Sequence, residues 1–336
     1  MPDAAPFTFI IGCPRSGTTL LRAMLDSHPD LAVPPESYFL VPILRHAAEY
    51  RTAAGLDRAA LLRDVTANVS WPSWQVGAEV LDAIASDDSL TTVPDTLRAI
   101  YDRYAAVQGK RRAIDKTPRH TEHVGLLSAA YPDSRFVHLV RDGRDVVPSL
   151  RSMPYFPARF ADAALFWRDR ALSGREARTL VGAARYHELR YEDLVTDPER
   201  HLEPLCGFLG IEYSPEMLDY TDRAEAVIAG TVGGSAHANI RRAPTRTRDW
   251  RSDMDPRDVA RFEALAGDAL AVFGYDRGPA PSVALRAEAL ARHGADTLGK
   301  RTRILRARVR RRLPGAEGPS PPPRSDTLGG RGTVRP

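Results

Sequence analysis

The residues nearest the N-terminus that could do chemistry lie in the stretch FTFIIGCPRSGTTLLRAMLDSHPD. A short apolar run ends at Gly12, four residues separate it from Gly17, and a helical pattern follows. A strand that leads through a glycine loop into a helix gathers backbone N–H groups and the positive end of the helix dipole at one point. Gly17 lets the backbone approach a ligand, and Ser16, Thr18 and Thr19 add hydroxyl donors. The loop is therefore predicted to bind a phosphate group.

The residues that mark a site for a Mg²⁺-bound triphosphate are missing from this loop. In such sites a lysine follows the second glycine, and a later strand ends in an aspartate that helps to hold Mg²⁺. Here Thr18 stands in the lysine position, Arg15 lies inside the loop, and the strand predicted at 135–140 runs into Arg141. The loop therefore favours a nucleotide without a metal-bound triphosphate, and no metal site is expected. An Mg²⁺-ATP-dependent small-molecule kinase remains an alternative.

A second segment, RFVHLVRDGRDVVPSL, carries another candidate for binding phosphate. Arg141 ends a predicted buried strand, and Ser149 lies eight residues further on, along the following helix. The guanidinium fork of arginine suits a terminal phosphate monoester, and a serine hydroxyl can complete its coordination. Together the two segments predict a nucleotide that bears two separate phosphates.

These motifs carry a family resemblance. PRSGTT, LVRDGRDVVPSL and RYEDL resemble the sulfotransferases that use 3′-phosphoadenosine 5′-phosphosulfate (PAPS) and release 3′-phosphoadenosine 5′-phosphate (PAP), over about residues 7–276. The run RSGTTLLRAMLDSHPD is similar to the branch that includes tyrosylprotein sulfotransferases and many bacterial enzymes. The resemblance implies that the 5′-phosphosulfate is held by Arg15, Ser16, Gly17, Thr18 and Thr19. It implies further that Arg141 and Ser149 hold the 3′-phosphate and that Tyr191 lies near the nucleotide.

The same resemblance indicates a base. Sulfuryl transfer should resemble phosphoryl transfer in needing in-line positioning, a base for the acceptor proton, and stabilisation of the leaving oxygen. Glu36, in VPPESYF, falls where the tyrosylprotein branch has its catalytic glutamate relative to Arg15. Burial that raised the pKa of Glu36 would improve it as a base. Three histidines remain alternatives for this role: His28, His120 and His123.

A lysine and a late segment complete the candidate site. Nearly all basic residues of the chain are arginines, and its only lysines are Lys110, Lys116 and Lys300. Lys116 follows a predicted strand, at the edge where α/β sheets present ligands. The resemblance implies that Lys116 stabilises the leaving group. The segment GGSAHANIRRAPTRTRDWRSDM resembles the part of the family that closes over the nucleotide, which implies that Ser235 or Arg248 reaches the phosphates.

Alternating apolar runs and helical patterns predict the elements that position these residues. Strands are expected at 7–12, 111–115, 135–140 and 185–190. Helices are expected at 18–27, 59–69, 93–107, about 120–131, from about 144, from 198, and at about 256–273. This order predicts an α/β, P-loop-like three-layer fold with a central parallel sheet. The sulfotransferase domain is expected at 7–278, with a helical insertion at 39–108 as the acceptor region.

The distribution of charge along the chain limits the kinds of partner that can be expected. The 336 residues carry a formal net charge of +4. The segment 281–336 holds 13 basic and 4 acidic residues, so it carries +9 and residues 1–280 carry −5. The basic charge belongs to the tail, and the folded body gives no reason to expect nucleic acid. Two cysteines are too few for a disulfide framework, and no signal segment is apparent, so a cytoplasmic location is expected.

The tail at 279–336 has a character of its own. Residues 298–313 carry eight Arg or Lys, no acidic residue, and apolar residues at helical spacing. This pattern is typical of a basic amphipathic helix, which could contact an anionic membrane surface or serve only as a solvated tail. Residues 314–336 are rich in Gly, Pro and Ser and are expected to be disordered.

The function expected from all of these features is sulfuryl transfer from PAPS to a hydroxyl group of a small-molecule, glycan or lipid-linked acceptor. A non-catalytic nucleotide-binding protein remains a further alternative. Tyr38, Phe39, Trp71 and Trp74 could line an aromatic acceptor pocket or pack in the core. The oligomeric state is not predicted.

Overall fold

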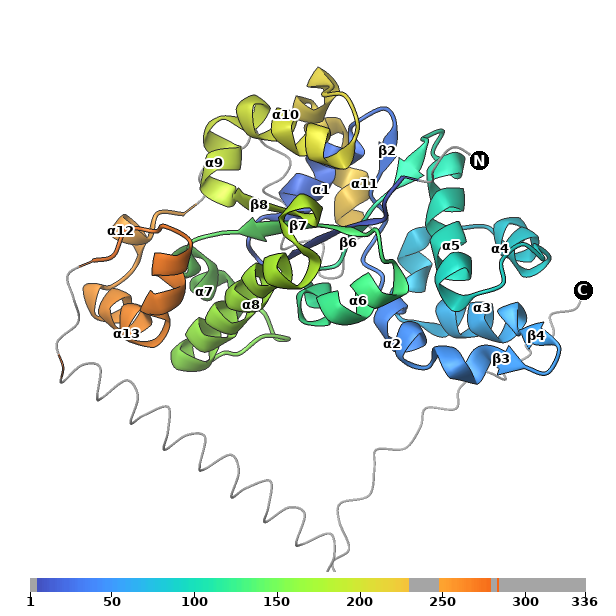
Figure 1. The fold of residues 1–336 in the computed structure, drawn as a ribbon. Coiled ribbons are helices and arrows are strands. Elements are labelled where there is room, and N and C mark those ends of the chain that lie inside the picture. Colours follow the sequence, from blue (N-terminus) through green and yellow to red (C-terminus); the bar gives the residue numbers. More distant parts are fainter. Residues whose placement is uncertain (1–4, 230–247, 279–282, 284–336) are drawn as a thin grey trace, which may run out of the picture. The chain divides into compact units, whose positions relative to one another are not determined.

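The central element of the fold is a parallel sheet. The computed structural model describes residues 5–229, 248–278 and residue 283, which belong to one compact unit of residues 1–289. The four strands of the sheet are parallel and lie in the order β6-β1-β7-β8 (Figure 1). Their bounds are β1 Thr8–Gly12, β6 Asp115–Lys116, β7 Arg135–Val140 and β8 Tyr186–Arg190.

Both faces of this sheet are buried. Phe9 and Ile11 of β1 pack on one face, whereas Ile10 packs on the other, as the two-residue period of a strand requires. A parallel sheet covered on both faces reads as a continuous apolar run, which is why the run at 7–12 predicted a strand. The structure confirms this strand and the strand at 135–140.

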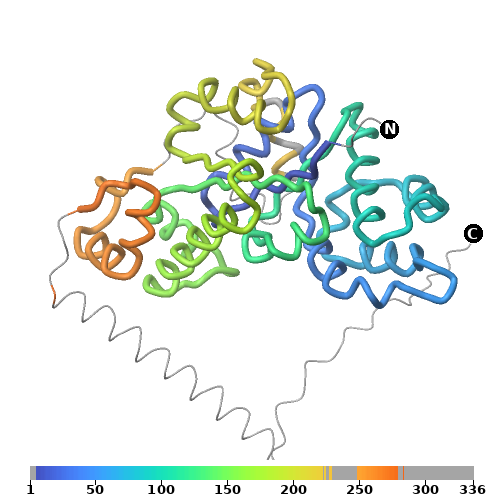
Figure 2. Tube along the Cα trace, in the orientation of Figure 1, coloured from blue at the N-terminus to red at the C-terminus, as the bar shows by residue number. Residues whose placement is uncertain are grey.

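Two helical layers cover the sheet (Figure 1). The layer against Ile10 holds α1 Thr18–Asp26, α9 Tyr191–Thr196, α10 Pro198–Leu209 and α11 Ala224–Ala229. The opposite layer holds α6 Val124–Ala130, α7 Gly143–Arg151, α8 Phe160–Val181 and α13 Pro256–Val272. Figure 2 shows α1, in blue, beside α11, in yellow, although nearly two hundred residues separate them in the sequence. The predicted three-layer α/β fold is confirmed.

The predicted insertion at 39–108 is mostly helical. It holds α2 Leu40–Arg45, α3 Arg58–Ala67, α4 Ala78–Ala85, α5 Val93–Val107 and the 3₁₀ turns η1 Ala47–Tyr50 and η2 Trp71–Trp74. Sequence reasoning missed one small hairpin, formed by β3 Arg51–Thr52 and β4 Gly55–Leu56. The aromatic residues proposed for an acceptor pocket include Phe39, whose ring lies 5.2 Å from that of Trp74, which is 1% exposed. Phe39 and Trp74 are therefore core residues of the insertion.

Two predicted elements are wrong in detail. The single strand expected at 111–115 is divided: β5 Arg112–Ala113 pairs with β2 Leu31–Ala32, and only β6 joins the central sheet. The helix expected at about 120–131 begins as the 3₁₀ turn η3 Pro118–His123 and becomes α-helical only in α6. The 22-residue helix α8 and the short α9 were not predicted.

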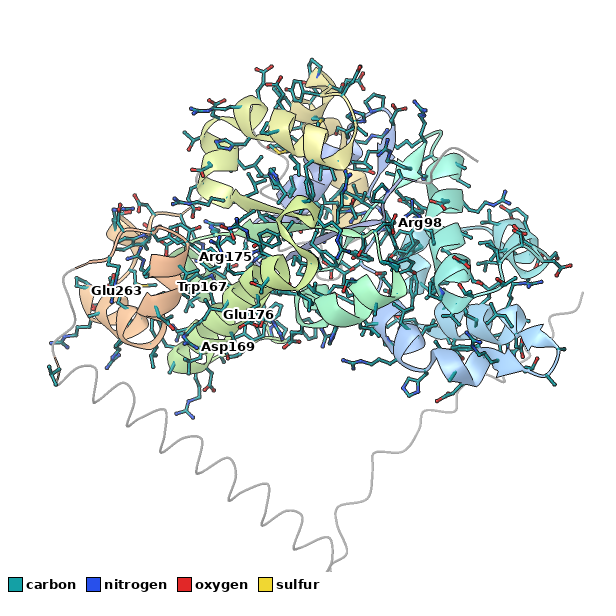
Figure 3. All side chains as sticks on the ribbon, viewed as in Figure 1. Arg98, Trp167, Asp169, Arg175, Glu176 and Glu263 are labelled. Carbon is teal, nitrogen blue, oxygen red and sulfur yellow. The ribbon has the colours of Figure 1, made fainter. Side chains whose placement is uncertain are left out.

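A buried arginine joins α7 to α13. Arg144 donates to Asp142 at 2.7 Å and to Glu263 at 2.8 Å, and it also donates to the backbone oxygen of Asp276. Glu263 comes from α13 (Figure 3), and Trp167 of α8 donates its indole N–H to the backbone oxygen of Arg141. These contacts fix the start of α7, which follows β7 after Arg141 and Asp142.

Some predicted features cannot be placed. Ser235, the basic segment 298–313 and the remainder of the tail from 284 lie outside the described residues. Within the part of the chain that the structure describes, no helix has both the length and the apolar character needed to cross a bilayer.

Candidate active site

The loop between β1 and α1 adopts a conformation that few side chains tolerate. Arg15 has φ 72° and Gly17 has φ 96°, both in the left-handed region. A residue other than glycine in this region is uncommon and is found most often where function requires it. Gly17 is also the N-cap of α1, and no side chain caps the helix there. The positive end of α1 is therefore left for an anion from outside the helix.

A threonine that sequence reasoning did not single out holds the start of the loop. Thr121, in η3, accepts a hydrogen bond from the backbone N–H of Gly12 at 2.8 Å. The same hydroxyl lies 2.7 Å from the backbone oxygen of Pro118, to which it donates. On the other side of the loop, a Cβ added to Gly17 would lie 2.3 Å from the ring of Tyr191. Packing from both sides thus sets the shape of the loop.

This contact gives a stability prediction. Gly17→Ala is expected to lower the free energy of unfolding by the left-handed penalty of about 1–2 kcal/mol and by a further amount for the overlap with Tyr191. Gly274→Ala is the matched control, because Gly274 also has a left-handed φ of 67° but has open space around it. Urea denaturation of both variants measures the difference. Equal losses would show that Tyr191 does not pack tightly on the loop.

Three arginines converge beside the loop. Arg15 donates from Nε to the Ser149 hydroxyl at 3.0 Å. Burial, together with the nearby charges of Arg248 and Arg141, lowers the pKa of Arg15. The guanidinium carbon of Arg141 lies 4.2 Å above the ring of Tyr191. Like charges gathered in this way repel one another unless an anion binds between them.

Several donors at this place have no acceptor among the described residues. They are the hydroxyl of Ser16 and the Nε and Nη2 atoms of Arg141, all buried. A buried donor without a partner is costly, so it calls for an explanation such as a bound anion. Tyr191 lies between the two groups, since its ring contacts both Gly17 and Arg141. The residues therefore fit a ligand with two separated phosphates.

Arg248 reaches the cluster because its segment is anchored on α7. The backbone N–H of Trp250, in α12 Trp250–Asp253, donates to Asp145 at 2.7 Å. The guanidinium carbon of Arg144 lies 3.6 Å from the centre of the Trp250 ring, close enough for a cation–π contact. These contacts hold the segment whose Arg248 acts electrostatically on Arg15, and the role of Arg248 at the phosphates stays a prediction.

The second part of the site is an ion pair. Lys116 of β6 donates to Glu36 with Nζ and Oε1 2.6 Å apart, and the side chains are 0% and 13% exposed. The hydroxyl of Tyr38 donates to the other carboxylate oxygen of Glu36 at 2.5 Å. Glu36 and Lys116, proposed from separate segments, are therefore in direct contact.

The electrostatics of this pair differ from the simple expectation of a raised pKa. Burial alone would raise the pKa of Glu36. The charge of Lys116, the hydrogen bonds from Lys116 and Tyr38, and the charge of Arg22 together lower this pKa overall. The pKa of Lys116 is also lowered, first by burial and then by Arg22, against the opposing effect of Glu36. The lowered pKa keeps the Glu36 carboxylate ionised and makes it a weaker proton acceptor than the raised pKa that was expected.

The three histidines that remain alternatives for the base each contact other groups. His28 lies 2.8 Å from the backbone oxygen of Glu212 through Nε2, and its Nδ1 accepts from the N–H of Asp30, so both ring nitrogens are engaged. His120 is buried and lies 2.9 Å from Asp115 through Nδ1. His123 contacts Arg45 at 3.2 Å.

Comparisons with known proteins give several relatives. A sequence model described as the sulfotransferase family matches residues 6–215. The nodulation protein NoeE of Sinorhizobium fredii is 27% identical over 294 residues, which cover 80% of this chain and 66% of that protein. Protein-tyrosine sulfotransferase 1 of Danio rerio is 27% identical over 287 residues, with 81% of this chain and 72% of that protein covered.

One solved structure has a similar fold. The sulfotransferase domain of the Synechococcus PCC 7002 olefin synthase superposes with a TM-score of 0.51 at 27% identity. The superposition covers 82% of this chain and 98% of that domain.

Proposed function

The chain belongs to the sulfotransferase family, and from that premise we propose that it transfers the sulfuryl group of PAPS to a hydroxyl group of its acceptor. The observation that carries the proposal is the pair of unsatisfied donor groups, Ser16 in the loop and Arg141 at the end of β7, on either side of Tyr191. PAPS bears a phosphosulfate and a separate 3′-phosphate, and so matches two anion positions.

The residues divide the binding between them. Arg15, Ser16, Gly17, Thr18 and Thr19 hold the 5′-phosphosulfate through backbone N–H groups, hydroxyls and the start of α1. Arg141 and Ser149 hold the 3′-phosphate. Ser149 also receives the hydrogen bond of Arg15, and so connects the two positions. The Tyr191 ring packs against the nucleotide. Arg248 adds positive charge from the segment that precedes α12.

Glu36 and Lys116 act on the reacting atoms. Glu36 accepts the proton of the acceptor hydroxyl while that oxygen forms its bond to sulfur. The bond between sulfur and the oxygen of the 5′-phosphate breaks, and Lys116 stabilises the charge that this oxygen gains. The products are the sulfated acceptor and PAP. As Lys116 turns to the leaving oxygen, its hold on Glu36 weakens, which makes the carboxylate a stronger base at the moment when the proton moves.

The acceptor is proposed to be a hydroxyl of a small molecule, a glycan or a lipid-linked molecule, reached through the insertion at 39–108 of a domain that spans 7–278. The relatives named protein-tyrosine sulfotransferases add a phenolic hydroxyl to these classes. Tyr38 borders the base, and the guanidinium of Arg119 lies 5.7 Å from its ring. Acceptors are therefore expected to meet the Tyr38 ring and the Arg119 guanidinium near Glu36.

Calorimetric titration with PAP, beside ATP with Mg²⁺, tests the proposed donor. Arg141→Ala is expected to weaken PAP binding by about 2 kcal/mol, roughly 30-fold, because a charge-assisted contact to phosphate is lost. Arg151→Ala is the matched control, since Arg151 is the last residue of α7 and donates to the backbone oxygen of Ala158. Tight binding of Mg²⁺-ATP with none of PAP would overturn the proposal in favour of a kinase.

A further inference from the structure

The segment that carries Glu36 is clamped to the strand that carries Lys116. The backbone N–H of Ser37 donates to the hydroxyl of Thr117 at 2.9 Å, and the Ser37 hydroxyl donates to Asp115 Oδ2 at 2.5 Å. The Lys116–Glu36 contact of 2.6 Å lies between these two. We call the two hydrogen bonds of Ser37 the clamp, because they hold the residue that follows Glu36 on both neighbours of Lys116.

Asp115 is the buried acceptor of one of these two hydrogen bonds. Its carboxylate is 0% exposed. Besides Ser37, its Oδ2 atom accepts hydrogen bonds from the hydroxyls of Tyr101 at 2.8 Å and Thr117 at 3.1 Å, and its Oδ1 atom lies 2.9 Å from Nδ1 of His120. These donors outweigh the effect of burial and lower the pKa of Asp115. A buried carboxylate held from four sides is a rigid anchor.

Asp115 and Lys116 are successive residues of β6, so their side chains point to opposite faces of the sheet. Asp115 therefore makes no contact with Glu36, although its charge acts to raise the pKa of Lys116 and the loop that it holds carries Glu36. Among the described residues, three contacts join Ser37 to β6 and Thr117. Two are the hydrogen bonds given above, and the third is a weaker contact of 3.3 Å between the hydroxyls of Ser37 and Thr117.

We propose that Asp115 and Thr117 are positioning residues, which act through Ser37 to hold the Glu36 carboxylate against Lys116 in the geometry that proton transfer requires. The assignment rests on the proposed sulfuryl transfer for its effect on rate. The clamp itself is a property of the fold and can be tested separately. It assigns a function to a buried polar cluster that neither binds the nucleotide nor touches the reacting atoms.

Two variants break the clamp and one matched variant does not. Ser37→Ala removes the hydroxyl that bonds Asp115, and Thr117→Val removes the acceptor of the Ser37 N–H with little change of shape. Tyr101→Phe removes a hydroxyl bond to the same Oδ2 atom but leaves the loop untouched. Each variant is measured for thermal stability and PAP affinity. Its turnover is measured with sulfur-labelled PAPS and 2-naphthol as a probe acceptor.

Ser37→Ala and Thr117→Val are expected to lower kcat roughly 10- to 100-fold, because a small misplacement of a reacting group is sufficient for such a loss. PAP affinity is expected to stay unchanged. The acid limb of kcat/KM should move to higher pH, since Glu36 would feel Lys116 less, while Tyr38 and Arg22 still face it. Tyr101→Phe should lose stability but keep turnover and pH profile. Equal losses of turnover in Tyr101→Phe and the two clamp variants would overturn the proposal.

A second readout does not depend on activity. The chain has only three lysines, so nitrogen labelling of lysine allows the Lys116 side-chain signal to be followed by NMR as the pH is changed. The charges of Arg22 and Asp115 also act on Lys116 and are kept in all three variants. The titration of Lys116 should therefore change in Ser37→Ala and Thr117→Val, where Glu36 moves, and stay as in the unaltered chain in Tyr101→Phe. An unchanged titration in both clamp variants would overturn the proposal. If the unaltered chain failed to bind PAP, the proposed function would fail, while this comparison would still test the clamp.

Discussion

Glu36→Gln is expected to lower kcat by roughly 10²- to 10⁴-fold, the range that a positioned general base contributes. The amide keeps the shape of the side chain and can still accept a hydrogen bond from Lys116, but it cannot take the proton of the acceptor hydroxyl. Because the proposed contacts to PAP come from the loop, Arg141 and Ser149 and not from Glu36, PAP affinity should change little. Steady-state turnover with sulfur-labelled PAPS, measured beside PAP titration, separates the two effects.

Glu36→Asp provides the control for this variant. It keeps the carboxylate but shortens the side chain by one methylene, so its turnover should lie between that of the unaltered chain and that of Glu36→Gln. If Glu36→Gln kept full turnover, the base would have to be sought elsewhere, and His120 and His123 would be the next residues to replace.

Lys116→Met is expected to lower kcat by roughly 10²- to 10³-fold, as removal of one stabilising group at a developing negative charge does. It should also move the acid limb of kcat/KM to higher pH. Glu36 must be ionised to act, so activity falls as pH drops through its pKa. Lys116 is the main group that lowers this pKa, and without it the opposing effect of burial remains. A pH–rate profile of the variant measures both changes.

Lys110→Met is the matched control, because Lys110 is the other lysine of the described chain and is also buried. Its ammonium lies 2.9 Å from the backbone oxygen of Leu31, to which it donates, and it also bonds the end of α1. Its replacement should lower thermal stability but leave the acid limb in place. An acid limb that stayed unmoved in Lys116→Met would contradict the assigned coupling between Lys116 and Glu36.

The parts of the fold that depend on local pattern could be predicted from the sequence. The helix at 93–107 has the predicted bounds, because Thr92 caps it and Pro94 occupies a first-turn position. The strand at 135–140 was clear because both of its faces are buried. The loop around Gly17 and the arginine at 141 could be proposed as a phosphate site because such a site needs glycine, hydroxyl and guanidinium groups close to strand ends.

The parts that depend on tertiary contact could not be predicted in this way. Two-residue ladders such as β2 with β5 have no periodicity to detect, so the strand expected at 111–115 was not seen to divide. The lowered pKa of Glu36 depends on a lysine 80 positions away. Thr121 and Ser37 gave no signal, because a single hydroxyl becomes informative only when its partner is known. The packing of Tyr191 on Gly17 likewise required the structure.

Transfer of labelled sulfur tests the central claim most directly. The purified chain is incubated with sulfur-labelled PAPS and, in separate reactions, with a phenol, a tyrosine peptide, a glycan and a lipid-linked alcohol. The account predicts that label passes to at least one hydroxyl acceptor, with one PAP formed for each sulfate ester, and that Glu36→Gln suppresses the transfer. Absence of label on every acceptor, together with transfer of the terminal phosphate of Mg²⁺-ATP to one of them, would contradict it.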